Sequence, residues 1–246
     1  VMSITGDSES APLRVGYPIA DTIGGLTAAM AIAAALNAPE RGGFIDISML
    51  ESVIATMGWV VSNHLIGGVT PAPAGNENLT SAPSGAFQCA DGLLNIAANK
   101  DEQWEMLALH LGREDLLGAP DYRTREARKS NRLRLKAELE TVLTTRPARA
   151  WAKELNQIGV PAGAVLTLPE VLAHPQIAER GLIARFAEVP GLDRSIDLLR
   201  TAVKIDGAAP AVETPPPELG AHNGEIYGAL GLGAEDIAAL EAEGVL

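Results

Sequence analysis

The sequence predicts a mixed α/β chain with a parallel α/β unit at its N-terminal end and a smaller α+β module after it. The first observation is a strand–helix–strand–helix order over residues 15–68, which favours a parallel sheet covered by helices. The second is the linker composition of residues 67–83, which are rich in Gly, Pro, Ala, Asn, Ser and Thr. The third is the Asp91-Gly92 pair between two short apolar runs, which is typical of an antiparallel hairpin.

The N-terminal unit is predicted to begin with a strand over residues 15–20, which turns through two glycines into a helix over residues 23–37. That helix consists largely of alanine, so it can pack closely against its neighbours. Apolar residues alternate in residues 45–49, which predicts a second strand. A second helix is expected over residues 50–66.

The module after the hairpin is predicted to be mostly helical. Asp101 and Thr124 are suitable helix caps, and the helix after Thr124 is expected to be long and basic. Pro147 suits the start of another helix. A strand is expected over residues 160–166 and a helix over residues 169–180.

The remainder of the chain is predicted to form two strands and then two short helices. The strands are expected over residues 183–189 and 198–205, and a proline-rich stretch separates them from the helices. The helices are expected over residues 224–230 and 234–242.

Composition argues against several classes of protein. The chain has 246 residues, of which 47% are hydrophobic, enough for a sizeable core. Acidic side chains outnumber Lys and Arg by 31 to 19, which argues against a nucleic-acid surface. The single Cys89 suits a reducing compartment, and the apolar run at residues 26–36 is too short to span a bilayer. We therefore expect a soluble cytoplasmic protein that does not bind a membrane.

Asp21 is the main candidate for chemistry. It follows the first predicted strand, at the start of the first helix, where free backbone N–H groups favour an anion. Two interpretations fit a carboxylate at this place, a plain N-cap and a nucleophile. The surrounding residues leave both open.

Other potential sites are weaker. Cys89 lies in a predicted strand, where a buried and inert thiol is expected. The four histidines lack a ligand spacing, so no metal site is expected. The basic run at residues 123–136 is interpreted as a solvated helix face, or alternatively as a surface that contacts phosphate groups or a partner subunit.

Seven groups of motifs follow one another along the chain. They are YPIADTIGG at 17–25; RGGFIDISML at 41–50; APSGAF at 82–87 with Asp91-Gly92; DYRT at 121–124 with Arg128 and Asn131; Trp151 with GVPAG at 159–163; HPQ at 174–176 with RG at 180–181; and PELGAH at 217–222. In this order the chain resembles the class III CoA-transferases, also called the CaiB/BaiF family. The resemblance covers nearly the whole chain.

The resemblance implies a two-domain enzyme whose two subunits interlock. Residues 1–66 and 205–246 would form part of a Rossmann-like large domain, and residues 85–181 would form the small α+β domain. Residues 67–84 would be a linker with the active-site loop, and residues 182–204 a returning linker. The family's N-terminal half-sheet and most of its CoA-binding groups would precede this chain, so the chain resembles the C-terminal part of such an enzyme and activity is expected to need the upstream part. The long Gly/Pro/Ala-rich connection also predicts a crossing segment and an intertwined homodimer.

The resemblance also implies a mechanism. Asp21 matches the family's nucleophile, which forms an aspartyl anhydride with an acyl-CoA donor and then an aspartyl-CoA thioester, from which a small carboxylic acid takes the CoA. Acyl-CoA is thus a substrate, and no permanently bound cofactor is expected. The loop that shields the anhydride would lie between Gly75 and Gly85, with Asn76 and Ser81 as further substrate-binding residues.

Two alternatives remain open. A related branch racemises 2-methylacyl-CoA thioesters with a His-Asp pair, but Ala20 precedes Asp21 here. The other alternative is an inactive truncated fragment that only dimerises or packs. Neither the acyl donor nor the acceptor can be identified from these residues.

Overall fold

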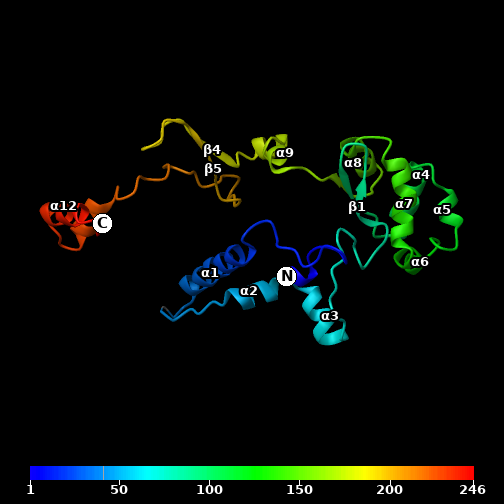
Figure 1. The fold of residues 1–246 in the computed structure, drawn as a ribbon, viewed down its shortest axis with the longest axis horizontal. Coiled ribbons are helices and arrows are strands. Elements are labelled where there is room, and N and C mark those ends of the chain that lie inside the picture. The colour runs from blue at the N-terminus through cyan, green and yellow to red at the C-terminus, as the bar shows by residue number, and fades with distance from the viewer. Residues whose placement is uncertain (41) are drawn as a thin grey trace. The chain divides into compact units, whose positions relative to one another are not determined.

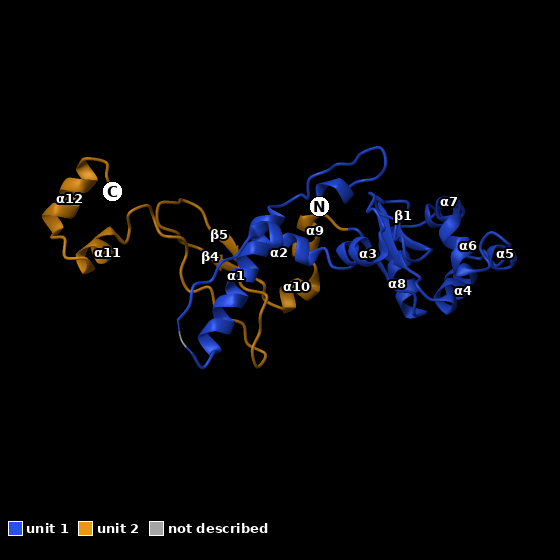
Figure 2. Cartoon of the chain, turned by 90° about the horizontal axis from the view of Figure 1, so that it is seen from below, with its two compact units in different colours: residues 1–165 blue, residues 166–246 orange. Residues whose placement is uncertain are grey.

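The computed structural model describes residues 1–40 and 42–246. These residues form two compact units, residues 1–165 and residues 166–246, which Figure 2 shows in blue and orange. Both units combine helices with antiparallel strands (Figure 1), so the predicted mixed class is confirmed. Arg41, the first residue of the RGGFIDISML motif, lies outside the described residues. The unit boundary falls inside the range predicted for the small domain, and the five predicted domain segments stay predictions.

The elements of each unit follow in chain order. The first unit contains the 3₁₀ helix η1 (Met2–Ile4), α1 (Ile19–Asn37), α2 (Met49–Thr56), α3 (Trp59–Gly67), β1 (Ser84–Gln88), β2 (Leu93–Ala97), α4 (Asp101–His110), α5 (Asp115–Gly118), α6 (Arg125–Ser130), α7 (Arg132–Leu143), α8 (Ala148–Gln157) and β3 (Ala162–Ala164). The second unit contains α9 (Leu168–Leu172), α10 (Pro175–Glu179), β4 (Ile183–Phe186), β5 (Ile196–Leu199), α11 (Asn223–Ala229) and α12 (Ala234–Ala242).

Helix α1 begins at Ile19, before its predicted start, and the strand expected over residues 15–20 is wrong. The helix begins with a hydrogen bond from the Thr22 N–H to the Pro18 carbonyl at 3.0 Å. Pro18 has no N–H to give to a sheet, and its fixed φ suits a residue directly before a helix. By length and composition alone, the 19 residues of α1 could cross a membrane, with a mean hydropathy of 1.7. The shorter apolar run considered in the sequence is therefore only part of this helix.

The turn predicted at Gly24 and Gly25, before the helix, is wrong, because both glycines lie within α1. Gly24 is buried, and a Cβ atom there would lie 3.1 Å from Cγ of Met49. Glycine at this position therefore lets the first residue of α2 lie close to α1.

The strand predicted over residues 45–49 is also wrong. Residues 42–48 have no helix or strand assignment, and α2 already begins at Met49. An extended segment becomes a strand only when a neighbour completes its ladder of hydrogen bonds. The two sheets of the described residues are antiparallel, so the parallel sheet expected for this unit is not observed. The helix expected over residues 50–66 is divided at Gly58, whose φ of +51° lies outside the helical region.

The predicted hairpin is confirmed and forms the centre of the first unit's core. Strands β1 and β2 pair antiparallel with Phe87 opposite Leu94, and β3 pairs with β2 through Ala164. Helix α7 contacts β1, and α8 contacts β2 and β3. Large side chains of this core include Phe87, Leu94, Ile96, Trp104, Leu107, Leu135, Leu139, Leu143, Trp151 and Leu155.

The long helix expected after Thr124 consists of two helices, α6 and α7. Thr124 caps α6 as predicted, because its Oγ accepts a hydrogen bond from the Ala127 N–H at 3.1 Å. Asn131 separates the two helices, and its side-chain amide donates to the carbonyls of Ala127 and Asp121 at 3.0 and 3.2 Å. An Asn side chain that bonds nearby carbonyls competes with the helical ladder, which explains the division.

Other helix boundaries differ in detail. Asp101 is the first residue of α4 and Lys100 is its N-cap, so the prediction of an Asp101 cap is wrong. Pro147 directly precedes α8 as its N-cap. The strand predicted over residues 160–166 is limited to the three residues of β3.

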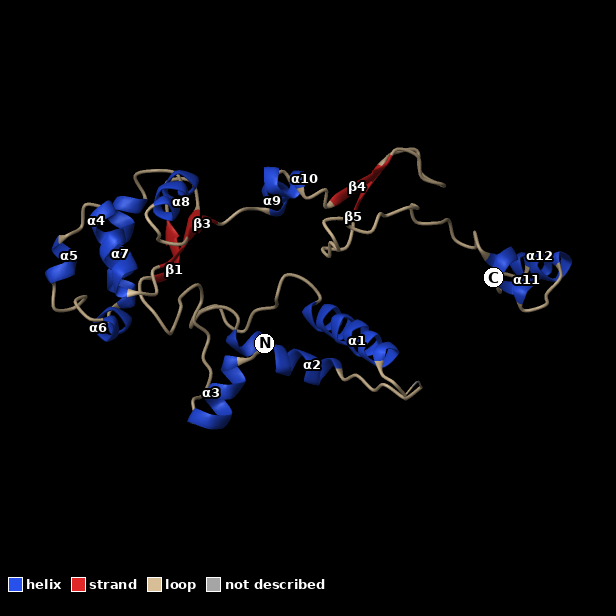
Figure 3. Cartoon of the chain, turned by 180° about the vertical axis from the view of Figure 1, so that it is seen from behind, coloured by secondary structure: helices blue, strands red, loops and turns tan. Residues whose placement is uncertain are grey.

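The second unit contains a two-stranded sheet and four short helices (Figure 3). The helix expected over residues 169–180 is divided before Pro175, which begins α10 with His174 as its N-cap. Strands β4 and β5 are shorter than predicted and pair with Ile183 opposite Leu199. The two C-terminal helices are confirmed, and α12 has the predicted bounds.

Candidate active site

Asp21 lies in the first turn of α1, with its side chain exposed. The N-cap is Pro18, and no side chain caps the described N-terminus of α1. The interpretation of Asp21 as an N-cap is therefore wrong. The first backbone N–H groups of a helix lack intrahelical partners and, with the helix dipole, favour negative charge in the first turn. The arrangement presents a solvent-accessible carboxylate in the first turn of α1.

The predicted loop residues Gly75, Asn76 and Ser81 belong to the segment that precedes β1, and Gly85 is the second residue of β1. The Gly75 N–H donates to the Gly6 carbonyl at 2.7 Å, and the Ala86 N–H donates to the Asn76 carbonyl at 3.2 Å. Gly85 has a φ of +148°, and a Cβ atom there would lie 2.5 Å from the Asn76 oxygen. Glycine is therefore required at position 85 for this approach.

Ser81 is a buried polar residue of the predicted loop. Its exposed fraction is 2%, and among the described residues its hydroxyl has no hydrogen-bond partner. A buried hydroxyl without a partner is uncommon, because burial removes its bonds to bulk water. Ser81 thus supplies an unused polar atom within the predicted loop.

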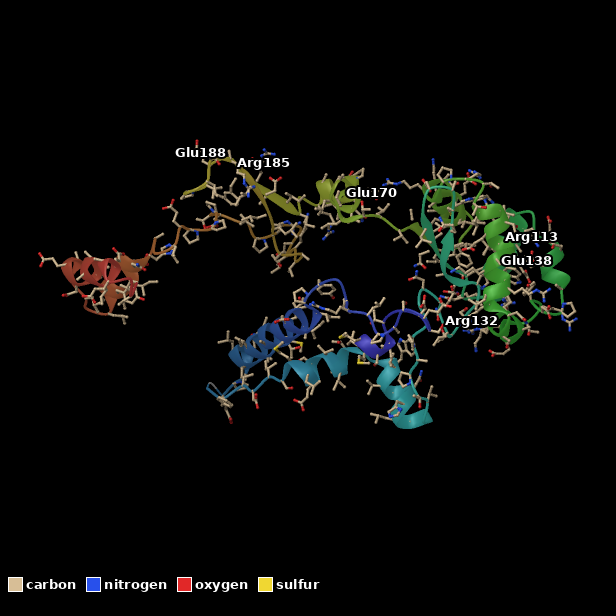
Figure 4. The ribbon with its side chains drawn as sticks, in the orientation of Figure 1. Arg113, Arg132, Glu138, Glu170, Arg185 and Glu188 are labelled. Atoms are coloured by element: carbon tan, nitrogen blue, oxygen red, sulfur yellow. The ribbon has the colours of Figure 1, made fainter. Side chains whose placement is uncertain are left out.

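Basic side chains of α6 and α7 hold this same segment. Arg125 donates to the Thr80 carbonyl at 3.1 Å, and Arg128 donates through Nε to the Ala82 carbonyl at 2.9 Å. Arg132 donates to the carbonyls of Asn78 and Leu79 at 2.9 and 3.4 Å, and Lys136 pairs with the Glu77 carboxylate at 2.9 Å. Figure 4 shows Arg132, which is the first residue of α7. We call these four basic residues the loop clamp. The interpretation of the basic run as a solvated face is wrong for the buried Arg128, whereas Arg125 is exposed and Arg132 and Lys136 are half-buried.

Arg128 is buried, with an exposed fraction of 2%, which its place in a basic run does not predict. Its guanidinium also bonds the Tyr122 carbonyl at 3.2 Å and the Asp101 carboxylate, and it lies 5.6 Å from the centre of the Trp104 ring. No local signal marks this burial, because the partners Ala82 and Asp101 lie 46 and 27 residues away in the sequence.

A cavity of about 730 Å³ lies beside the loop segment. Its lining includes Trp59 and Asn63 of α3, Gly75, and residues 77–80, and the exposed lining is mostly apolar. A space of this size and character suits part of a small organic ligand. Of the predicted loop residues, Gly75 lines it.

The structure brings the four predicted loop residues onto one segment but does not join that segment to Asp21. Among the described residues, no hydrogen bond or ion pair connects α1 with residues 75–85. The relation between the Asp21 carboxylate and the loop therefore rests on the resemblance to the family and stays a prediction.

Comparison with known proteins identifies the family. The sequence profile described as CoA-transferase family III matches residues 1–223. A succinyl-CoA:mesaconate CoA-transferase of Haloarcula hispanica is 30% identical over 236 residues, which are 95% of this chain and 59% of the relative. A succinyl-CoA–D-citramalate CoA-transferase of Chloroflexus aurantiacus is 30% identical over 255 residues, with 100% of this chain and 62% of the relative covered.

A solved structure agrees with these sequences. The crystal structure of a CaiB/BaiF family protein from Brucella suis matches with a TM-score of 0.78 and 29% identity, covering 93% of this chain and 60% of that one. This chain spans less than two thirds of the length of each of these relatives. Since the family profile covers most of the sequence, the chain belongs to CoA-transferase family III.

Proposed function

We propose that the protein containing this chain transfers CoA from an acyl-CoA thioester to a carboxylic acid, with Asp21 as the nucleophile. The observation that carries this proposal is the exposed Asp21 carboxylate in the first turn of α1, within a chain of CoA-transferase family III. A carboxylate is the side chain that can form both an acid anhydride and a CoA thioester. The helix N-terminus offers N–H groups to a developing oxyanion.

The chemistry proceeds through three covalent species. A carboxylate oxygen of Asp21 attacks the thioester carbonyl, the C–S bond breaks, and CoA leaves as a thiolate. The thiolate then attacks the aspartyl carbonyl of the anhydride, which releases the donor's acid as a carboxylate and leaves an aspartyl-CoA thioester. The acceptor carboxylate attacks that thioester, again releasing the thiolate. Attack of the thiolate on the acceptor's acyl carbon yields the new acyl-CoA and restores Asp21.

The acceptor is proposed to be a small dicarboxylic acid. The two relatives are named for succinyl-CoA with mesaconate or D-citramalate, which are dicarboxylates. The loop with Gly75, Asn76, Ser81 and Gly85 is proposed to lie against the bound substrate and to keep water from the anhydride. The Rossmann-like large domain, the intertwined homodimer and the cytoplasmic location are parts of the same proposal. CoA itself acts as a substrate and is not a resident cofactor.

The racemase alternative is not favoured. The named relatives are CoA-transferases, and Ala20 stands where the racemase branch would have its histidine. The third alternative, an inactive fragment, predicts that neither the full-length protein nor this chain forms a covalent acyl species at Asp21.

Substitution of Asp21 tests the proposal in the full-length protein. We expect Asp21→Asn and Asp21→Ala to abolish transfer while leaving the folded state and CoA affinity nearly unchanged, because neither side chain can form an anhydride. Transfer is measured with succinyl-CoA and a panel of dicarboxylates. Glu102→Gln is the matched control, since Glu102 is an exposed acidic residue in the first turn of α4. Near-normal transfer by Asp21→Asn would contradict the proposal.

A covalent assay locates the nucleophile independently of turnover. Full-length protein is incubated with acyl-CoA, quenched with hydroxylamine or borohydride, and digested with trypsin. The expected mass change lies on the peptide of residues 15–41, which contains Asp21, and is absent from the Asp21→Asn variant. A modified residue elsewhere would assign the nucleophile to that residue.

A further inference from the structure

The members of the loop clamp come from two helices. Arg125 and Arg128 are three residues apart on α6, and Arg132 and Lys136 are four residues apart on α7, so each pair lies on one face of its own helix. They meet a coil segment 45 to 59 residues earlier in the sequence, and three of the four bind it through backbone carbonyls. The contacts therefore depend little on the side chains of the segment and fix the course of its backbone.

The same segment also lines the cavity. Glu77, Asn78, Leu79 and Thr80 line the 730 Å³ cavity, and each also accepts a hydrogen bond or an ion pair from the clamp. We call residues 77–80, which share both roles, the wall of the cavity. A change in the clamp alters the wall without removing a side chain that lines the cavity.

The members of the clamp differ in burial. Arg128 is fully buried in the core and supports the fold around it. Arg125 is exposed and Arg132 is half-buried at the start of α7, and these two bind the carbonyls of residues 78–80. Leu79 and Thr80 are themselves exposed, so this part of the wall lies outside the core. Arg132 therefore affects the position of the wall more than the stability of the core.

We propose that Arg132, supported by Arg125, is a positioning residue that fixes the wall at residues 77–80 and thereby decides whether the acylated enzyme transfers CoA or is hydrolysed. This inference rests on the proposed function, in which the loop keeps water from the anhydride. Water attack on the anhydride breaks its C–O bond and yields the donor carboxylate, the Asp21 carboxylate and two protons. One proton goes to the CoA thiolate, so the net reaction is acyl-CoA plus water to carboxylate, CoA-SH and one proton. A displaced wall raises this reaction relative to transfer.

The test compares Arg132→Gln with Arg134→Gln in the full-length protein. Arg134 lies on the same helix but bonds Asp121 at 2.6 Å and lies 5.9 Å from the Tyr122 ring, away from the loop segment. Hydrolysis and transfer are measured in one reaction with succinyl-CoA and a dicarboxylate, from free CoA and new acyl-CoA. We expect Arg132→Gln to raise the ratio of hydrolysis to transfer about tenfold, the order expected for loss of a charge-assisted hydrogen bond. Arg134→Gln should leave the ratio unchanged.

Hydrogen–deuterium exchange gives a readout that does not depend on activity. We expect amides within residues 77–82 to exchange faster in Arg132→Gln and at the parental rate in Arg134→Gln. Arg132→Lys should recover part of both effects, because one ammonium group can donate to the Asn78 carbonyl but cannot reproduce the guanidinium fork. Thermal midpoints of all variants report any general loss of stability.

Each outcome decides between the claims. An active Arg132→Gln variant with the parental ratio, or equal increases in Arg132→Gln and Arg134→Gln, overturns the inference. Unchanged exchange at residues 77–82 in Arg132→Gln overturns it as well. If the parent protein shows neither transfer nor labelling of Asp21, the proposed function fails and the catalytic role of the clamp fails with it. Exchange then still shows whether Arg132 holds the segment.

Discussion

Cys89 lies between β1 and the hairpin turn with a 2% exposed fraction, so the predicted burial is confirmed. Burial raises the pKa of its thiol from 9.0 to about 11, and the nearby charges of Asp91 and Glu140 add to the increase. A thiolate is the nucleophilic form of cysteine. The thiol is therefore protonated at neutral pH and has no part in the proposed chemistry.

The Cys89 thiol makes stability depend on alkaline pH. Its folded-state pKa is above its unfolded value, so its contribution is complete below pH 9 and is lost as the pH rises through about 11. The two-unit difference corresponds to at most about 3 kcal/mol. We expect Cys89→Ala to lose less stability than the parent between pH 8 and pH 10.5 in denaturant titrations. Equal pH dependence of the two proteins would contradict this assignment.

Substitution of Cys89 should also separate stability from activity. We expect Cys89→Ser to keep most of the transfer activity, with a stability loss of about 1–2 kcal/mol from the buried hydroxyl. A folded Cys89→Ser variant without turnover would instead support a thiol mechanism.

At the scale of elements, the segment before β1 pairs with that strand through a short bridge. Glu77 pairs with Gly85, and the Asn78 N–H donates to the Ser84 carbonyl at 3.1 Å. The bridge connects the loop segment to β1. The partner strand of β1 in the hairpin, β2, contributes Leu94 and Ile96 to the core. Gly85 is the residue on which this connection depends, because any side chain there would overlap the Asn76 carbonyl.

Gly85→Ala should therefore cost more stability than alanine at another glycine of similar backbone conformation. Gly92 is the matched control, since its φ is +150° and the space for a Cβ atom there is open. We expect a loss of about 3 kcal/mol for Gly85→Ala and about 1 kcal/mol for Gly92→Ala, measured by chemical denaturation. Equal losses would mean that backbone conformation alone explains the effect and that the loop does not approach Gly85 closely.

At the scale of the molecule, α1 is apolar around its circumference. Leu26, Met30, Ile32 and Leu36 are all more than half exposed, and of its 19 residues only Gly24 is buried. A helix of this composition is normally covered by protein or lipid.

The homodimer has a direct test. We expect light scattering on the full-length protein at micromolar concentration to give twice the subunit mass. The reason is the extended Gly/Pro-rich connection at residues 67–83, which suits two subunits that cross. A monomeric mass at this concentration would end the prediction.

The sequence by itself determined the family and the elements whose signals are local. The order of the motifs predicts the class III CoA-transferases, and the family profile confirms this prediction. The Asp91-Gly92 turn, the Thr124 cap and the bounds of α12 were also predictable, because their causes lie within a few neighbouring residues. Asp21 and the four loop residues were named from family motifs, and their roles stay predictions.

Only the tertiary structure decided what depends on distant parts of the chain. Residues 45–49 alternate like a strand, yet residues 45–48 have no strand assignment and Met49 begins α2, because pairing requires a neighbour that the local pattern cannot supply. In the sequence, Arg128 is one of several basic residues in a run and has no local mark of burial. Its guanidinium is buried because it binds the Ala82 carbonyl and the Asp101 carboxylate, which lie 46 and 27 residues away. A buried guanidinium is stable only where such partners converge, and that convergence is a property of the folded chain.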